Sequence, residues 1–211
     1  MSLTLYYHPL SSFCHKPLVA LYENGTAFEK RLIDLSKEAD RAELAVAWPL
    51  IRFPVLRDDA RKCHVPESSI IMEYLDRHYP GAQPLIPNRA EDALEVRLWD
   101  RIFDNYVQVP MQRIVADRGN GANADMTRER ALLQAAYAMI DRQLAAHPWI
   151  VAGAFSMADC AAAPALYFAN LVAPFGKAHE PTAVYLGRLM ARPSFARAVK
   201  EAAPYLALVP K

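Results

Sequence analysis

The sequence has 211 residues, and its 24 basic and 23 acidic residues leave a formal net charge of +1. A chain of this length buries about 70% of the surface that its unfolded form exposes, enough for one large core or two joined cores. The balanced charge excludes the strong positive field of a protein that binds nucleic acid or a membrane surface, so we expect neither partner.

Cysteine and histidine usage bears on location and on metals. Cys14, Cys63 and Cys160 show no paired spacing, which favours a reducing compartment. The sequence has no signal peptide and no run of 18 apolar residues, so we expect a cytoplasmic protein. The six histidines are scattered without the spacing of metal ligands, and we expect no metal site.

The start of the chain predicts a strand, a sharp turn and the beginning of a helix. Residues 3–7 are apolar and aromatic, as in a buried strand, and Pro9 ends the ladder because it has no N–H to donate. An apolar period of four residues then predicts a helix that begins at about Ser11 or Ser12 and ends at Asn24. The first N–H groups of a helix lack internal partners and its dipole is positive there, so this turn favours a small anion or a thiolate.

The rest of the first 80 residues alternates between strands and helices. A second strand follows the first helix, which predicts a right-handed βαβ unit with parallel pairing. A hairpin and a helix with an apolar face come later. In chain order we expect a strand over 27–33, a weak helix over 36–48, hairpin strands over 52–57 and 61–65, and a helix that opens at Glu67-Ser68 and ends at Tyr79.

Residues 80–87 predict a domain boundary. Three prolines and a glycine in this segment stop any helix and stiffen the chain. We therefore expect a first domain over residues 1–80, a linker over 81–87 and a second domain over 88–211. The second domain is helical in pattern, with an apolar repeat every four residues that ends where a proline breaks the helix: Leu94, Leu98, Ile102 and Tyr106, then Pro110.

A helix start with its own signature lies further along the second domain. Phe155 precedes Ser156, and Asp159 follows three residues after that serine, the spacing of a capping box with a hydrophobic staple. Asp159 is therefore expected to stabilise the fold and to take no part in catalysis. The run 158–165 is rich in alanine, which predicts a central, tightly packed helix.

Four of these segments together resemble the cytosolic glutathione S-transferase superfamily, in a Ser-type, bacterial-like form. They are the turn with Ser11, the segment Phe53-Pro54-Val55-Leu56, the helix start Glu67-Ser68, and Phe155-Ser156-Met157-Ala158-Asp159. The resemblance extends over nearly the whole chain. It implies an α/β N-terminal thioredoxin-like domain (βαβ-ββα) that binds glutathione, an all-α C-terminal helical domain that binds the second substrate, and a homodimer.

The resemblance also implies how one side of glutathione is held. Pro54 would follow a cis peptide bond, and the backbone of Phe53, next to Val55, would pair with the cysteinyl main chain as an added strand does. Residues 48–52 stand where relatives often have a Gly and a Lys or Gln. We therefore expect Arg52 to hold the glycyl carboxylate with its bidentate fork.

The other end of glutathione would lie at the helix that begins with Glu67 and Ser68. The Ser68 hydroxyl and the free N–H groups of that helix would bind the γ-glutamyl carboxylate, and the Glu67 carboxylate would approach the ammonium group. A capping role for Ser68 is compatible with this assignment.

The resemblance implies that Ser11 is the catalytic residue: its hydroxyl would donate a hydrogen bond that stabilises the glutathione thiolate. Tyr7, at the end of the first strand, and Ser12 are alternatives for the same task. Cys14 is a third alternative, but the pair that a dithiol mechanism needs is absent because Ser11 stands in the first position. His15-Lys16 is interpreted as a solvated helix face.

The activity implied is attack of the bound thiolate on an electrophilic small molecule, with glutathione as co-substrate and no metal. The walls of an apolar pocket for that molecule are expected from two parts of the chain: His8, Pro9 and Leu10, and Tyr106 and Met111. Two alternatives stay open: glutathione-dependent reduction of peroxides or disulfides, and a non-catalytic module that keeps the fold without the chemistry.

Overall fold

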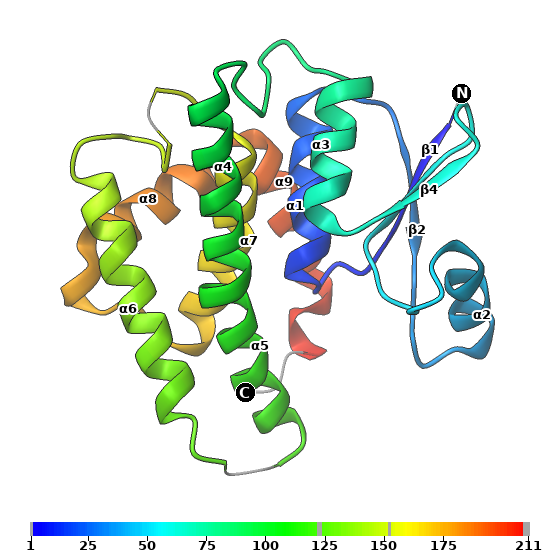
Figure 1. Cartoon of the computed structure of the whole chain (residues 1–211). Coiled ribbons are helices and arrows are strands. Elements are labelled where there is room, and N and C mark those ends of the chain that lie inside the picture. The colour runs from blue at the N-terminus through cyan, green and yellow to red at the C-terminus, as the bar shows by residue number, and fades with distance from the viewer. Residues whose placement is uncertain (1, 122–123, 152, 209–211) are drawn as a thin grey trace. The chain divides into compact units, whose positions relative to one another are not determined.

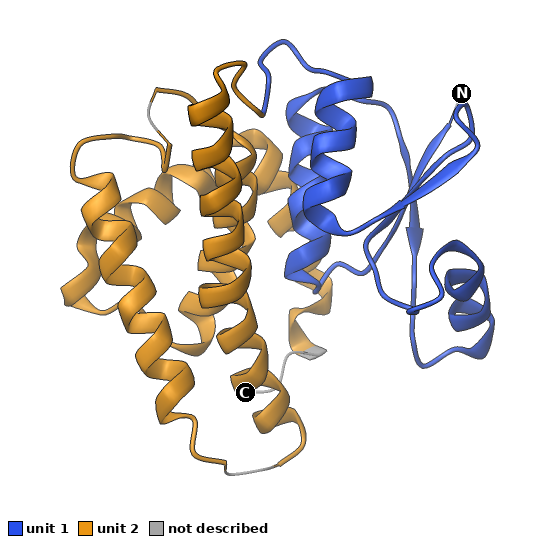
Figure 2. Cartoon of the chain, in the orientation of Figure 1, with its two compact units in different colours: residues 1–85 blue, residues 86–211 orange. Residues whose placement is uncertain are grey.

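The computed structural model describes residues 2–121, 124–151 and 153–208. Contacts within the chain divide it into two compact units, unit 1 over residues 1–85 and unit 2 over residues 86–211 (Figure 2). None of the described helices combines the length and the apolar character that crossing a bilayer requires.

Unit 1 contains a four-stranded mixed sheet in the order β2-β1-β3-β4. β1 pairs in parallel with β2 and antiparallel with β3, and β3 pairs antiparallel with β4. Figure 1 shows α1 and α3 side by side on one face of this sheet and α2 on the other. The elements are β1 (Leu3–Tyr7), α1 (Ser12–Glu23), β2 (Glu29–Leu32), α2 (Glu38–Ala47), β3 (Val55–Asp58), β4 (Cys63–Pro66) and α3 (Ser68–His78).

This order confirms the predicted α/β thioredoxin-like arrangement, βαβ followed by ββα. All five residues of β1 are buried, because helices cover the central strand on both faces. β2 lies at one edge of the sheet and is mostly exposed, and its Glu29, Lys30 and Arg31 are the charged residues that protect an open edge from pairing with another chain.

Unit 2 is helical, as predicted. Its helices are α4 (Ala90–Ile102), the π-helix η1 (Phe103–Gln108), α5 (Val109–Gly119), α6 (Thr127–Leu144), α7 (Met157–Val172), the 3₁₀-helix η2 (Lys177–His179), α8 (Glu180–Ala191), α9 (Pro193–Ala202) and the 3₁₀-helix η3 (Ala203–Leu208). α7 packs against α4, η1, α5 and α8, and nearly all of its residues are buried. The prediction of a central, alanine-rich helix is therefore confirmed.

The predicted end of a helix at Pro110 is wrong. α4 runs through η1 directly into α5, and Pro110 lies in the first turn of α5. The π-helix shifts the hydrogen-bond register to five residues, which lets the helix continue through a residue that has no N–H.

The apolar repeat predicted for α4 does not follow the buried side of the helix: Ile102 is buried, but Leu94 and Leu98 face away from the unit 2 core. Leu94 and Leu98 are 69% and 56% exposed, whereas Ala93, Val96 and Phe103 are buried. The buried side is the one that packs against α7.

The capping box at the start of α7 is present. The Asp159 carboxylate accepts hydrogen bonds from the N–H and hydroxyl of Ser156 at 2.8 and 2.9 Å, from the N–H of Ile150 at 3.2 Å and from the hydroxyl of Tyr185. Burial raises the pKa of Asp159, although these bonds act in the opposite direction. The residue stabilises the junction of three segments of unit 2.

Candidate functional site

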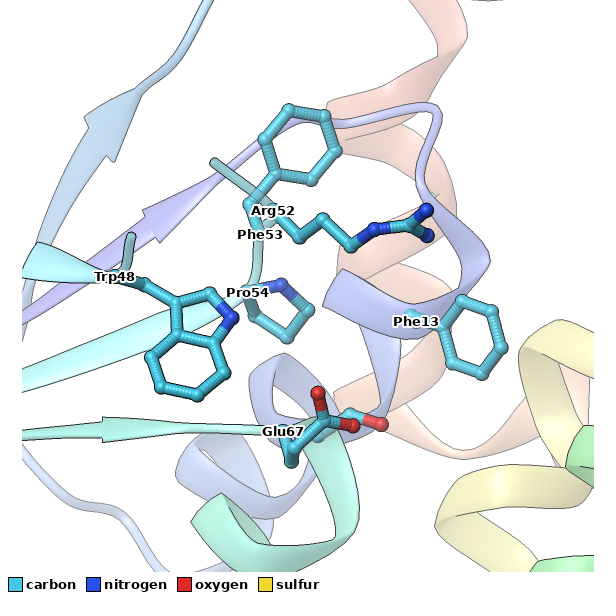
Figure 3. A pocket seen from close by; sticks show the side chains of 7 residues that line it. Phe13, Trp48, Arg52, Phe53, Pro54 and Glu67 are labelled. Atoms are coloured by element: carbon cyan, nitrogen blue, oxygen red, sulfur yellow. The ribbon is translucent and has the colours of Figure 1, made fainter. Parts of the chain in front are cut away.

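Unit 1 contains a pocket of about 180 Å³ (Figure 3). Three segments form its wall: the first turn of α1, the loop between α2 and β3, and the junction of β4 with α3. The lining residues are Phe13, Trp48, Arg52, Phe53, Pro54, Glu67 and Ser68. Five of these were predicted as glutathione-binding residues. Val55, the sixth predicted residue, is buried in β3 and does not line the pocket.

The loop between α2 and β3 is held on the unit 1 core. Trp48 ends α2 with an N–H bond to the carbonyl of Leu44 at 2.7 Å, and its own carbonyl accepts from the N–H of Ile51 at 2.9 Å. Trp48 and Phe53 both pack against the core cluster of Tyr6, Ile33, Leu44, Ala47 and Val55. The peptide bond between Phe53 and Pro54 is cis, as predicted.

Glu67 takes an unusual backbone conformation where β4 meets α3. Its φ is +67°, in a region that residues other than glycine rarely adopt, and it is the N-cap residue of α3. Its side chain is exposed, whereas Ser68, the first residue of α3, is buried. Strained residues of this kind cluster at ligand sites, so the conformation itself points to a function for Glu67.

The polar groups of the pocket share one property: none of them has a side-chain partner among the residues that the structure describes. This holds for the Arg52 guanidinium, the Glu67 carboxylate, the Ser68 hydroxyl and the indole N–H of Trp48. Arg31 of the same unit, in contrast, pairs with carboxylates of α2. Such unpaired groups are available to a ligand.

Figure 3 shows how these groups are directed. The Arg52 guanidinium and the Glu67 carboxylate lie on opposite sides of the pocket, and Trp48 presents the edge of its indole that carries the nitrogen toward Pro54. The pocket therefore offers a guanidinium on one side and a carboxylate on the other, with the indole N–H of Trp48 as a further donor. This arrangement fits an extended ligand with separate charged ends.

Ser11 is the N-cap residue of α1. Its hydroxyl oxygen accepts a hydrogen bond from the N–H of Cys14 at 3.3 Å, and its own N–H donates to the carbonyl of His8 at 3.0 Å. Ser11 is half-buried, Ser12 is buried at the start of α1, and Tyr7 is buried in β1. None of the three lines the described pocket, which the neighbouring Phe13 does.

Cys14 is fully buried, and burial raises its pKa to about 12. Hydrogen bonds with the Ser11 side chain and the His8 backbone oppose that effect without overcoming it. The thiol is therefore protonated at neutral pH, in the environment of an inert structural cysteine.

The prediction that His15-Lys16 forms a solvated helix face is wrong. Both side chains are fully buried. The His15 ring contacts the carbonyl of Pro9 through Nε2 at 2.6 Å, and the Lys16 ammonium donates to the Ser69 hydroxyl at 3.0 Å. Lys16 therefore connects α1 to the first turn of α3, a contact that the helical period of α1 alone does not reveal.

The residues predicted to form a second, apolar pocket lie in both units. His8 and Leu10 are half-buried and Pro9 is buried in unit 1, whereas Tyr106 is half-exposed in η1 and Met111 is buried in α5 of unit 2. None of these residues lines the pocket of unit 1. In the described ranges, no group of three His, Cys, Asp or Glu residues is placed to hold a metal ion.

Phe13 and Trp48 are pocket residues that were not predicted as binding residues. Trp48 lies in the segment 48–52 that departs from the relatives' pattern, so the signal was present in the sequence but was not assigned to the ligand. Phe13 belongs to the apolar period that predicted α1, and only the structure shows that it lines the pocket.

Comparison with known proteins places the chain in a family. Residues 5–83 match the family model for the glutathione S-transferase N-terminal domain, and residues 123–207 match the model for the C-terminal domain. A stringent starvation protein A homolog of Haemophilus influenzae is 29% identical over 208 residues, which cover 96% of this chain and 92% of that protein.

Solved structures agree with these matches. A glutathione S-transferase of Methylobacterium radiotolerans, in complex with glutathione sulfonate, is 27% identical, with a TM-score of 0.82 and coverage of 94% of this chain and 95% of the other. A glutathione S-transferase of Methylobacillus flagellatus with glutathione bound shares the fold, at 22% identity, a TM-score of 0.83 and coverage of 93% and 98%. Because the two family matches together span most of the sequence, the chain belongs to the glutathione S-transferase superfamily.

Proposed function

We propose that the pocket of unit 1 binds glutathione and that the Ser11 hydroxyl stabilises its thiolate for attack on an electrophilic small molecule. The observation that carries the proposal is the convergence of unpaired polar groups of Arg52, Trp48, Glu67 and Ser68 on one pocket, with the Arg52 guanidinium opposite the Glu67 carboxylate. Glutathione has a carboxylate at one end and both a carboxylate and an ammonium group at the other, which matches this distribution.

Each group of the pocket then has a task. Glu67 pairs with the ammonium of the γ-glutamyl end, and Ser68 with the free N–H groups at the start of α3 binds the carboxylate beside it. Arg52 and the indole N–H of Trp48 bind the glycyl carboxylate. The backbone of Phe53 pairs with the cysteinyl main chain, which brings the thiol toward the turn that carries Ser11.

The turn that carries Ser11 can supply the free energy needed to lower the pKa of the glutathione thiol. A free thiol has a pKa of about 8.5, and lowering it by two units requires about 2.7 kcal/mol. A hydrogen bond to a charged group contributes roughly 1.5–3 kcal/mol, and the N-terminus of a helix adds roughly 0.3–1 kcal/mol. The position of Ser11 as the N-cap residue of α1 supports this proposal, because both contributions act at the start of a helix.

A second candidate function is a non-catalytic module that binds glutathione or another ligand in the same pocket. The relative from Haemophilus influenzae favours it, because its name, stringent starvation protein A homolog, states no reaction. Reduction of peroxides or disulfides is a third candidate that uses the same thiolate against a different electrophile.

Three further parts of the proposal rest on family membership. They are a homodimer, a cytoplasmic location and a role in detoxification. Cys14, Cys63 and Cys160, all of which the structure describes, form no disulfide bond, which is in keeping with a reducing compartment. Tyr106 and Met111 remain the proposed contribution of unit 2 to the site of the electrophile.

Calorimetric titration of the full chain with glutathione tests the binding step. We expect binding in the millimolar range or tighter, and we expect Arg52→Ala to weaken it about 10- to 100-fold, the equivalent of one lost charge-assisted contact. Glutathione with its glycyl carboxylate converted to an amide should bind the wild type and Arg52→Ala with similar affinity. Arg128→Ala, an exposed arginine of α6, is the matched control.

The outcomes separate the candidates. Absence of binding at millimolar glutathione would refute the proposal. Binding without turnover of any aryl halide, enal, peroxide or disulfide would favour the non-catalytic module. An equal loss of glutathione and amide affinity in Arg52→Ala would show that Arg52 does not hold the glycyl carboxylate.

A further inference from the structure

His8 holds two consecutive residues of the turn between β1 and α1. Its Nδ1 accepts a hydrogen bond from the N–H of Leu10 at 3.2 Å, and its carbonyl accepts from the N–H of Ser11 at 3.0 Å. The first contact is the one that an asparagine side chain makes in an Asx turn, two residues along its own backbone. The ring thus fixes the peptide that leads into Ser11.

The His8 ring is itself held in place. It stacks on the ring of Phe53, with 6.0 Å between the centroids and 20° between the planes. Phe53 lines the pocket and packs against the core cluster of unit 1. The position of the imidazole is therefore tied both to the Ser11 turn and to the wall where we place the cysteinyl part of glutathione.

The contact with Leu10 depends on the protonation state of the ring. Nδ1 accepts a hydrogen bond only in the neutral imidazole, because both ring nitrogens of the imidazolium carry a proton. When His8 is protonated, its Nδ1–H group faces the N–H group of Leu10. Two donors then face each other, and no hydrogen bond joins them. The Leu10 N–H then loses its acceptor, and the turn before α1 loses one of the hydrogen bonds that hold it.

Four titratable groups lie at or near this turn: His8 itself, Asp34, Cys14, and His15, whose ring contacts the Pro9 carbonyl at 2.6 Å. Burial lowers the pKa of His8 below 6.5, and the charge of Asp34 opposes this. Hydrogen bonds from Ser36 lower the pKa of Asp34 below its usual value, so Asp34 stays ionised. Cys14, which has a hydrogen bond with the His8 backbone, has a pKa of about 12 and stays protonated.

We propose that His8 is a positioning residue for Ser11: the neutral imidazole holds the turn in place, and its protonation releases Leu10 and the adjoining Ser11. The hydrogen bond is present above the pKa of His8 and is lost as the pH falls through it. The consequence for catalysis rests on the proposed role of Ser11 in thiol activation, whereas the release of the turn does not.

Two substitutions separate the acceptor from the charge. His8→Asn keeps an acceptor in the place of Nδ1 but does not titrate. His8→Leu removes the acceptor at every pH. His64→Asn, which replaces an exposed histidine of β4 in the same unit, is the matched control.

The first measurement uses the full chain without ligand. Nuclear magnetic resonance follows the Leu10 and Ser11 amides from pH 8 to 5. We expect both amides to shift and lose protection from hydrogen exchange with a single midpoint below 6.5, together with the His8 ring, in wild type and in His64→Asn. Neither amide should show that midpoint in His8→Asn.

The second measurement is the pH profile of kcat/KM with glutathione and an aryl halide, each variant normalised to its own value at pH 8. Titration of the thiol itself is common to all variants, so it cancels in the ratio of wild type to His8→Asn. One pH unit below the His8 midpoint, we expect that ratio to have fallen about three- to tenfold, the effect of one lost neutral hydrogen bond.

The results distinguish failure of this inference from failure of the proposed function. Leu10 and Ser11 amides that do not follow the His8 titration would overturn the inference, whether or not glutathione binds. Amides that follow it, with a constant ratio of the two pH profiles, would overturn the link to catalysis. A chain that neither binds glutathione nor turns over the aryl halide would refute the proposed function, and the amide titration would still decide whether His8 holds the turn.

Discussion

Replacing Ser11 by alanine tests the chemical assignment most directly. The substitution removes the hydroxyl that we propose as donor to the glutathione thiolate, and it leaves Arg52, Glu67 and Ser68 unchanged. Loss of a hydrogen bond to a charged group, roughly 1.5–3 kcal/mol, raises the pKa of the bound thiol by about one to two units. At neutral pH the rate of conjugation should therefore fall about tenfold to a hundredfold and recover as the pH increases.

The structure adds a second effect that must be separated from the first. The Ser11 hydroxyl also caps α1 by accepting the N–H of Cys14 at 3.3 Å, so Ser11→Ala should lower the free energy of unfolding by about 1 kcal/mol. The free energy of unfolding that is lost with the cap does not depend on pH near neutrality. The loss of conjugation rate caused by a raised thiol pKa does depend on pH. Ser11→Thr keeps both the hydroxyl and the cap, and it should retain the low thiol pKa.

Titration of the thiolate by its ultraviolet absorbance in the complex with glutathione measures the pKa. Glutathione affinity, measured in parallel, should change little. An unchanged thiol pKa in Ser11→Ala, together with a raised value in Tyr7→Phe or Ser12→Ala, would refute the assignment and transfer it to that residue.

Three further substitutions test other parts of the structure. Cys14→Ala should leave conjugation of an aryl halide largely intact, because burial keeps this thiol protonated; a selective collapse of peroxide or disulfide turnover would instead indicate a redox role. Burial opposes ionisation of Asp58, but hydrogen bonds from Tyr74 and Tyr79 outweigh it and lower its pKa, so Asp58→Asn should cost about 1–3 kcal/mol in urea unfolding at neutral pH. Because Asp58 stabilises the fold only while ionised, that difference should shrink as the pH falls from about 4 through its lowered pKa, and a constant difference would contradict the reasoning. Asp159→Ala removes an acceptor shared by four buried donors and should destabilise the chain by about 3–5 kcal/mol in thermal unfolding, with no effect on glutathione affinity once folded; a loss below about 1 kcal/mol would contradict its structural role.

Features with a local physical cause were predictable from the sequence. Residues 3–7 form β1 as expected, and α1 begins after Ser11, because strand alternation, a missing proline donor and a capping side chain act within a few residues. The capping box of Ser156 and Asp159 is predictable for the same reason. The resemblance to a family supplied the cis bond before Pro54, which local signals alone do not specify.

Features that depend on which faces meet were decided by the tertiary structure. His15 and Lys16 have the polarity of a solvated helix face, yet both are buried: Lys16 contacts α3, which packs against α1, and His15 contacts the turn before α1. Leu94 and Leu98 have the spacing of a core stripe, but α7 packs on the other side of α4. Trp48 becomes a wall of the pocket because the loop after α2 folds onto the core cluster of unit 1. A periodic sequence defines the faces of a helix, whereas packing against distant segments determines which of these faces is buried.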